Sequence, residues 1–223
     1  MSTTYQKIQS VFLRDEQTNY KTFLHGQWST PEIAYLSGLD WLWTEKVDGT
    51  NIRVTFAYDD TEHGYRKFDG RTDKADIPEF LYRRLTEMFD HQLLTNVFFP
   101  DGIEEKHIVL YGEGYGARIQ KGGGGYIPDG VNFILFDVKI NNVWLPFTSV
   151  IDIASQLNIP VVPIIGRGTL LEAIEHVKRG YPSVLPGATC QAEGLVCRPT
   201  TTLLDRRGER VVTKIKTRDF PKE

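Results

Sequence analysis

The sequence predicts an α+β fold in which the sheets are mainly antiparallel and helices flank them. Apolar, β-rich runs flank two pairs of turn-forming residues, Asp48-Gly49 and Asn141-Asn142, and each arrangement is typical of an antiparallel hairpin. Segments with the period of amphipathic helices lie between and after these hairpins. The chain of 223 residues contains no internal repeat and no clear linker, so we expect a single domain over residues 1–223.

Taken in order, residues 1–40 give only weak strand signals, and the first hairpin follows over 41–58. In its second strand, alternation divides the side chains between two faces. The apolar face would carry Ile52, Val54 and Phe56, and the polar face Asn51, Arg53 and Thr55. Residues 63–78 read as a polar, turn-rich connection, and residues 107–116 as a strand that breaks into a glycine-containing loop.

Three helices are expected, from about Pro78 to Leu93, over 148–158 and over 169–180. In the last of them Leu170, Leu171, Ile174 and Val177 would face inward, and Gly180 would end the helix. A short strand over 159–165 is expected at a sheet edge because two prolines interrupt it. Two final strands, over 193–199 and 210–217, would be joined by a turn near Arg207-Gly208.

Composition limits the class of protein. Hydrophobic residues make up 40% and charged residues 25%, no apolar run has the length of a membrane span, and the N-terminus lacks the order of a signal peptide. Two cysteines exclude a disulfide framework and a four-cysteine zinc site. We therefore expect a cytoplasmic protein with no membrane partner, and the compact size favours a phage, viral or bacterial origin. The net charge of -3 argues against a broadly basic surface, although residues 206–218 are rich in cations.

Five charged residues suggest the chemistry. Lys46 precedes the Asp48-Gly49 turn, Lys214 and Lys216 share one face of a strand, and Glu113 and Glu193 each adjoin a glycine. Each alone is more simply a solvated charge. Together, the carboxylates suit a ribose hydroxyl or a hydrated magnesium ion, and the cations suit a triphosphate. A neutral lysine amine is a competent nucleophile. The set predicts attack of Lys46 on the α-phosphorus of a nucleotide.

These residues fall in six blocks whose order resembles that of the lysyl-nucleotidyltransferases, the family of ATP-dependent RNA and DNA ligases and messenger-RNA capping enzymes. The blocks are Lys46-Val47-Asp48-Gly49, Arg71 in FDGRTD, YGEGYG around Glu113, FILFDVKI around Phe136, EGLV from Glu193, and Lys214-Ile215-Lys216. The resemblance spans residues 44–216, and six ordered blocks are far more specific than one K-x-D-G. It implies the ATP-grasp-like nucleotidyltransferase fold of DNA and RNA ligases.

Within that family the chain is most similar to RNA ligases of the phage T4 RNA ligase 2 type. Asn51, the RTD segment after Gly70 and the glycine-rich GYGARIQKGGGGY loop are features of that branch. Asp48 departs from it, because histidine is common there. The chain also ends seven residues after Lys216, where most relatives continue into a further domain. We therefore expect either a minimal, single-domain ligase with no appended C-terminal domain or the adenylyltransferase domain of something longer. A separate protein that supplies the missing C-terminal domain is a further expected partner.

The resemblance implies a role for each matching residue. Lys46 would form a lysyl-AMP with ATP, the AMP would pass to a 5'-phosphate RNA end, and a 3'-hydroxyl end would displace it, as in RNA repair. Magnesium, or manganese, would assist. For the nucleotide, the resemblance implies that the Glu45 backbone meets the adenine edge, Glu113 holds the ribose and Phe136 stacks on adenine. It implies that Lys214 and Lys216 neutralise the α-phosphate, and that Arg71 and Asn51 contact phosphate or the RNA end. Glu193 and Asn51 would bind the metal or its waters.

Three alternatives stay open at this point. A nick-sealing DNA ligase and a capping guanylyltransferase share most of these blocks, although Asn51 and Arg71 favour RNA. The third is a pseudoligase that binds nucleotide or RNA without turnover. The joint presence of Lys46, Glu193 and the two C-terminal lysines argues against it, since a pure binder needs no nucleophile.

Overall fold

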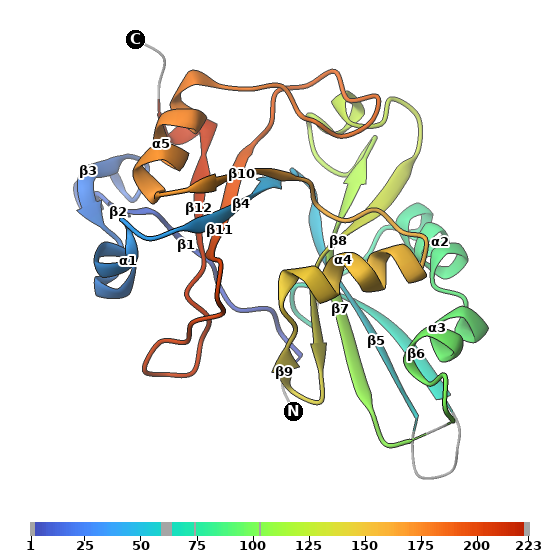
Figure 1. Cartoon of the computed structure of the whole chain (residues 1–223). Helices are drawn as coiled ribbons and strands as arrows, with labels where there is room; N and C mark the ends of the chain where they lie inside the picture. The colour runs from blue at the N-terminus through green and yellow to red at the C-terminus, as the bar shows by residue number, and fades with distance from the viewer. Residues whose placement is uncertain (1–2, 59–63, 74, 103, 221–223) are drawn as a thin grey trace. The chain divides into compact units, whose positions relative to one another are not determined.

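The computed structural model describes residues 3–58, 64–73, 75–102 and 104–220. The chain divides into two compact units, each built from separate stretches of sequence. Unit 1 comprises Met1–Tyr5 and Asp48–Val162, and unit 2 comprises Gln6–Val47 and Pro163–Glu223. Each unit has its own sheet and its own hydrophobic core, and each is described by itself (Figure 1).

Unit 1 contains a five-stranded antiparallel sheet of order β6-β5-β7-β8-β9. Its strands are β5 (Thr50–Tyr58), β6 (Gly64–Gly70), β7 (His107–Gly116), β8 (Val131–Ile140) and β9 (Val143–Trp144). The expected hairpin across Asn141-Asn142 is confirmed: these two residues join β8 to β9, and both adopt positive φ. Strand β6 occupies part of the segment expected to be irregular, and β7 continues through its glycines to Gly116.

The helices of unit 1 cover the apolar face of this sheet (Figure 1). They are α2 (Glu79–Met88), α3 (His91–Phe98) and α4 (Phe147–Gln156). A 3-10 turn, η2 (Gly123–Gly125), lies in the loop between β7 and β8. Ile52, Val54 and Phe56 of β5 are completely buried in this core, as their alternation predicts. The single helix expected from Pro78 to Leu93 is wrong. The chain leaves the helix at Phe89, and Asp90 accepts a hydrogen bond from the Leu93 N–H to cap a new one.

The opposite face of the unit 1 sheet is not the open polar surface that the alternation predicts. Arg53 is completely buried, and Thr55 is 5% exposed. The N-terminal segment contributes to this face: Thr3 accepts hydrogen bonds from Arg53 and from the Tyr111 hydroxyl, and the Tyr5 hydroxyl donates to Asp137. A buried guanidinium is tolerated here because chain from the far N-terminus supplies acceptors.

Unit 2 contains a five-stranded sheet of order β1-β12-β11-β4-β10, in which only the β1–β12 pair is parallel among the described residues. The strands are β1 (Gln9–Ser10), β4 (Trp41–Lys46), β10 (Ile164–Gly168), β11 (Gly194–Pro199) and β12 (Thr213–Lys216), with a separate pair β2 (Phe12–Arg14) and β3 (Phe23–Trp28). The remaining elements are α1 (Pro31–Leu36), α5 (Leu170–Arg179), η1 (Glu16–Thr18) and η3 (Thr217–Asp219).

Helix α5 shows how local sequence signals fix an element of unit 2. Thr169 and Glu172 form a reciprocal capping box at its start, and it ends before Gly180. Three of its four expected inward residues are buried, but Leu171 is 58% exposed. Strand β10 lies at the sheet edge, as expected, but begins only at Ile164, after both prolines.

The predicted hairpin over residues 41–58 is wrong. Strand β4 pairs with β10 and β11 in unit 2, whereas β5 pairs with β6 and β7 in unit 1. Gly49 does not have positive φ. Glycine is required at this position for lack of space, because a Cβ at Gly49 would stand 2.2 Å from the Gly114 carbonyl oxygen. Asp48-Gly49 thus connects two sheets and packs against β7.

The predicted α+β fold with mainly antiparallel sheets is confirmed. The assignment of residues 1–223 to one nucleotidyltransferase domain stays a prediction. No helix in the described ranges is long and apolar enough to cross a membrane.

Candidate active site

Lys46 is the last residue of β4 and lies among charged groups of unit 2. Its Nζ forms an ion pair with Glu193 Oε2. The other carboxylate oxygen, Oε1, accepts from Lys216 Nζ at 2.5 Å. The exposed fractions of these side chains are only 21% for Lys46, 13% for Glu193 and 14% for Lys216. One partly buried carboxylate therefore holds two ammonium groups.

The strand register explains why these residues meet. Gly194, next to Glu193, pairs with Lys46 of β4 on one side and with Lys216 of β12 on the other. A Cβ at Gly194 would stand 2.0 Å from the Ile215 carbonyl oxygen, so only glycine allows this close approach of β11 and β12. The Thr217 N–H also donates to the Glu193 carbonyl at 2.9 Å. Backbone packing thus places the Glu193 carboxylate between the two lysines.

The electrostatics of this cluster favour the ionised carboxylate. Burial alone would raise the pKa of Glu193, but the attraction of Lys46 and the hydrogen bonds from both lysines outweigh burial and hold the pKa below its ordinary value of 4.5. Lys214 pairs with Val196 of β11, two residues before Lys216 on the same strand. The structure therefore brings together Lys46, Lys216 and Glu193 of the residues that the sequence predicts for catalysis, and places Lys214 on the same strand as Lys216.

The side chain of Glu45, another predicted site residue, has a structural function in unit 2. Its carboxylate is buried and accepts from the Ser183 hydroxyl at 2.6 Å and the Val184 N–H at 2.9 Å. Its own N–H donates to the Pro163 carbonyl. No local sequence signal predicts these contacts, because Ser183 lies 138 positions after Glu45 in the chain. A contact of the Glu45 backbone with adenine stays a prediction.

A second group of predicted residues lies on one face of the unit 1 sheet. Asn51 of β5 is directly opposite Glu113 of β7, which places their Cβ atoms about 5 Å apart. Asn51 Oδ1 is buried and has no hydrogen-bond partner among the described residues. Because a buried polar oxygen without a partner is costly, this atom suits a ligand that brings a donor or a cation.

Phe136 sits at an irregularity of β8. Tyr111 pairs with Asp137 and Gly112 pairs with Leu135, so Phe136 is the extra residue of a β-bulge. Its ring lies 5.1 Å from the Tyr5 ring, which itself lies 5.1 Å from Tyr111. A bulge redirects a side chain, and here it presents Phe136 beside aromatic neighbours on the face that carries Tyr111 and Asp137.

Arg71 follows β6 and is exposed. The segment around it is held by Arg53, which was not among the predicted site residues. The buried Arg53 donates to the Gly70 carbonyl at 2.8 Å and to Asp73 Oδ1 at 2.6 Å. Its bonds thus flank Arg71 on both sides. The one signal for Arg53 was its place two residues after Asn51, on the same strand face.

A divalent metal fits the chemistry of the predicted donors. Mg²⁺ prefers oxygen ligands and is commonly held by one or two protein groups together with substrate phosphates. Glu193 offers carboxylate oxygens and Asn51 a buried amide oxygen. The described residues contain no cluster of three or more histidine, cysteine, aspartate or glutamate side chains that would hold a metal without substrate.

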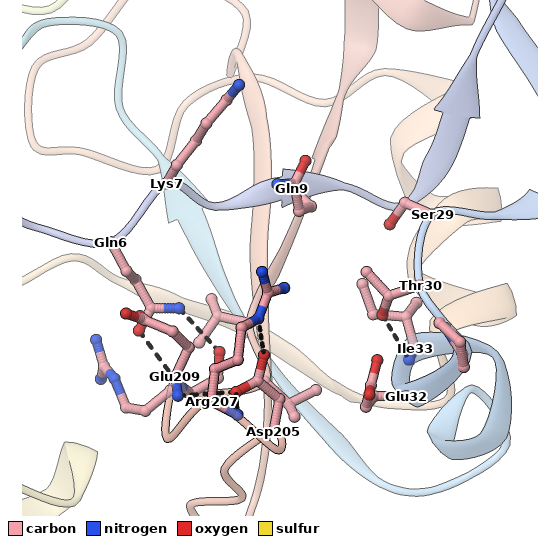
Figure 2. A pocket seen from close by; sticks show the side chains of 14 residues that line it. Gln6, Lys7, Gln9, Ser29, Thr30, Glu32, Ile33, Asp205, Arg207 and Glu209 are labelled. Carbon is pink, nitrogen blue, oxygen red and sulfur yellow. Dashed lines mark hydrogen bonds and ion pairs between the residues drawn. The ribbon is translucent and has the colours of Figure 1, made fainter.

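A polar cavity of about 460 Å³ in unit 2 is lined in part by the loop that contains Asp205, Arg207 and Glu209, and by none of the residues of the lysine cluster (Figure 2). Gln6 donates to the Arg210 carbonyl at 2.8 Å and accepts from the Arg210 N–H at 3.3 Å. Asp205 accepts from the N–H groups of Arg207 and Glu209. These bonds shape the turn near Arg207-Gly208 that the sequence predicts.

Comparison with known proteins gives a consistent result. A family model described as RNA ligase matches residues 39–216. A Naegleria gruberi RNA ligase variant with ATP and Mn shares 18% identity and a TM-score of 0.64, over 97% of this chain and 57% of that chain. The same organism's RNA ligase with PPi shares 19% identity and a TM-score of 0.61, over 97% of this chain and 60% of that chain. A variant of it with AMP and Mn shares 17% identity and a TM-score of 0.62, over 97% of this chain and 57% of that chain. No curated protein matches.

The chain thus spans about three fifths of the length of these ligases. At this level of identity the likeness establishes the fold. It covers the strands that carry both groups of predicted residues, since almost the whole chain is aligned.

Proposed function

We propose that this chain, which belongs to the RNA ligase family because that family's model matches residues 39–216, joins RNA ends with ATP through a lysyl-AMP intermediate. One observation carries the proposal: Lys46, Glu193 and Lys216 form a single, largely buried ion-pair cluster at the ends of three adjacent strands. A purely structural sheet edge would keep such lysines in solvent.

In the first step, the Lys46 ammonium loses a proton to solvent, and its amine attacks the α-phosphorus of ATP. An N–P bond forms, the bond from the α-phosphorus to the bridging oxygen breaks, and pyrophosphate leaves. Lys214 and Lys216 would balance the negative charge on the α-phosphate, since positioned cations supply most of what phosphoryl-type transfer requires. Glu193, which already accepts from Lys46 Nζ, would orient the neutral amine as a hydrogen-bond acceptor.

In the second step, an oxygen of an RNA 5'-phosphate attacks the same phosphorus, and Lys46 leaves. In the third, the 3'-hydroxyl oxygen of the other RNA end attacks the 5'-phosphorus, AMP leaves and a phosphodiester forms. Arg71, exposed beside a segment fixed by Arg53, is suited to a phosphate because guanidinium groups bind phosphate in a bidentate manner.

Nucleotide recognition is proposed for the face of the unit 1 sheet that carries Asn51, Glu113 and Phe136. Phe136, redirected by its bulge, would stack on adenine, and Glu113 would accept from a ribose hydroxyl. Glu193 in unit 2 and Asn51 in unit 1 are each proposed as an oxygen ligand of Mg²⁺ or Mn²⁺, directly or through water. Such an ion neutralises charge on the transferring phosphate. In this structure both Glu193 oxygens bind ammonium groups, so a metal would compete with Lys46 or Lys216 for them.

The test is incubation with α-labelled ATP or GTP and Mg²⁺, followed by denaturing electrophoresis. We expect a covalent adenylate in the wild type and none in Lys46→Ala. Lys46→Arg is the control that retains charge without a nucleophilic amine, and it should also stay unlabelled. The labelled protein, offered 5'-phosphorylated RNA, should transfer the label and yield a sealed product.

Other outcomes would identify a different function. Labelling by GTP alone would indicate a capping enzyme, and transfer to nicked DNA but not RNA would indicate a DNA ligase. Binding of RNA or nucleotide by a wild type that never becomes labelled would indicate a pseudoligase. The separate protein that would supply a C-terminal domain stays a prediction.

A further inference from the structure

We propose that a groove between α2 and the loop over residues 117–130 binds the phosphodiester backbone of the RNA substrate. This inference rests on the proposed ligase function. The groove belongs to unit 1, has a volume of about 300 Å³ and is lined by three arginines, Arg83, Arg84 and Arg118. Neither Arg71 nor any residue assigned above to catalysis or nucleotide binding lines it.

The arginines on α2 are available to a phosphate. Arg83 pairs with Glu79 at 3.0 Å, and Arg84 pairs with Glu87 at 3.5 Å and donates from Nε to Asn132 Oδ1 at 3.3 Å. The two arginine side chains are 73% and 41% exposed. Exposed ion pairs of this kind contribute about 0–1 kcal/mol, so a phosphate can replace the carboxylate partner at little cost. The planar guanidinium also matches two phosphate oxygens at once.

Arg118 adds an unusual observation. It has a φ of 67°, a left-handed conformation that is uncommon for residues other than glycine and costs about 1–2 kcal/mol. The neighbouring backbone is fixed, because the Ala117 N–H donates to the Gly130 carbonyl at 2.9 Å and the Ile119 N–H to the Gly116 carbonyl at 3.3 Å. Within the described part of the chain, the exposed Arg118 side chain has no hydrogen-bond or ion-pair partner. A held backbone therefore presents an unengaged guanidinium to the groove.

The groove suits an extended polyanion better than a single phosphate. Its cations are spread over a helix and a loop rather than converging on a closed pocket. The lining also includes two acids, Glu87 and Asp129, of which Glu87 is the ion-pair partner of Arg84. Phe80, 38% exposed, also lines it and offers a surface on which a base can stack. Cations interleaved with an aromatic ring are typical of surfaces that bind nucleic-acid strands.

The same loop holds the backbone that follows Lys46. Gln120 Nε2 donates to the Gly49 carbonyl at 3.0 Å, and the Asp48 N–H donates to the Tyr126 hydroxyl at 3.2 Å. RNA bound at Arg118 would therefore contact the loop that fixes Asp48 and Gly49. Binding of RNA in the groove would thus act on the segment that follows the proposed nucleophile Lys46, in addition to attracting RNA to the protein.

The experiment measures the affinity for 5'-phosphorylated RNA over a series of salt concentrations. The variants are Arg118→Gly, which removes the guanidinium and retains the left-handed backbone, and Arg84→Ala. Each lost phosphate contact should weaken binding and reduce the slope of log K against log salt by about 1, and the double variant by about 2. Arg179→Ala, which removes an exposed cation from unit 2, is the matched control and should leave the slope unchanged.

Formation of lysyl-AMP needs no RNA, so both groove variants should label with ATP as the wild type does. A wild-type salt slope and affinity in Arg118→Gly and Arg84→Ala would overturn the groove, and so would an equal loss in Arg179→Ala. Absence of lysyl-AMP in the wild type would instead defeat the proposed function, whatever the slopes.

Discussion

At the scale of single residues, the unusual feature is the Glu193 carboxylate, which is shared by the Lys46 and Lys216 ammonium groups. Two like charges beside one acid are stable only while that acid is ionised. The sequence identified all three residues through their blocks, but not that they would be bonded to one another. That contact depends on the register of β11 with strands distant in sequence.

Glu193→Gln should therefore destabilise the protein in a pH-dependent manner. The pKa of Glu193 is lowered in the folded protein, so its contribution is present above about pH 4.5 and is lost as the pH falls through the folded-state pKa. Near neutral pH the variant should lose about 1–3 kcal/mol in free energy of unfolding, because two ammonium groups lose their partner. Urea denaturation at neutral and acidic pH measures this.

The control is Glu175→Gln, which breaks the exposed ion pair with Lys178 and should cost less than about 1 kcal/mol. A deficit in Glu193→Gln that stays constant from neutral pH down to well below the ordinary carboxyl pKa would contradict the electrostatic explanation.

At the scale of elements, two irregularities position the predicted residues: the close approach of β11 to β12 at Gly194 and the bulge of β8 at Phe136. Local sequence signals predict neither. They do predict α5, whose capping box is contained in four consecutive residues, and the β8–β9 turn, whose two asparagines tolerate positive φ. Elements specified by neighbouring residues were predictable, whereas those specified by distant partners were not.

Gly194→Ala should destabilise unit 2 more than Gly187→Ala. Both glycines have positive φ, but a Cβ at Gly187 would meet nothing within 4 Å, whereas at Gly194 it would stand 2.0 Å from a backbone oxygen. The Gly187 variant should lose about 1–2 kcal/mol from the backbone conformation alone. Denaturant midpoints of the two variants compare them. Equal losses would mean that the strand approach does not require glycine.

Phe136→Ala should weaken ATP binding roughly 5- to 150-fold, because stacking of a base on an aromatic ring is worth about 1–3 kcal/mol. Calorimetric titration with ATP measures the change. Tyr35→Ala, which removes a ring that is 88% exposed in unit 2, is the control and should bind ATP normally. Unchanged affinity in the Phe136 variant would remove this residue from the nucleotide site.

For the whole molecule, the predicted fold class is confirmed, but the predicted pairing of the two strands on either side of Asp48-Gly49 is wrong. Asp48-Gly49 has the composition of a hairpin turn, yet it joins two sheets in different units. A turn signal reports backbone preference, not which strands pair, and β4 finds its partners in β10 and β11, more than 100 residues away. The buried Arg53 was likewise unpredictable, because Thr3 and Asp73, which satisfy it, lie in other segments.

The ordered blocks nevertheless selected candidate residues without the hairpin, because the chemistry of these residue types does not depend on how the two strands are connected. Each unit contributes a group of them, cations and a carboxylate in unit 2 and Asn51, Glu113 and Phe136 on one sheet in unit 1. The central claim is that Lys46 is the nucleophile.

Peptide mass spectrometry after incubation with ATP and Mg²⁺ tests that claim most directly. We expect an AMP adduct on the peptide that contains Lys46, with the fragment ions locating it on the Lys46 amine, and no adduct in Lys46→Ala. An adduct on Lys214 or Lys216, or no adduct in a folded wild type that binds ATP, would contradict it.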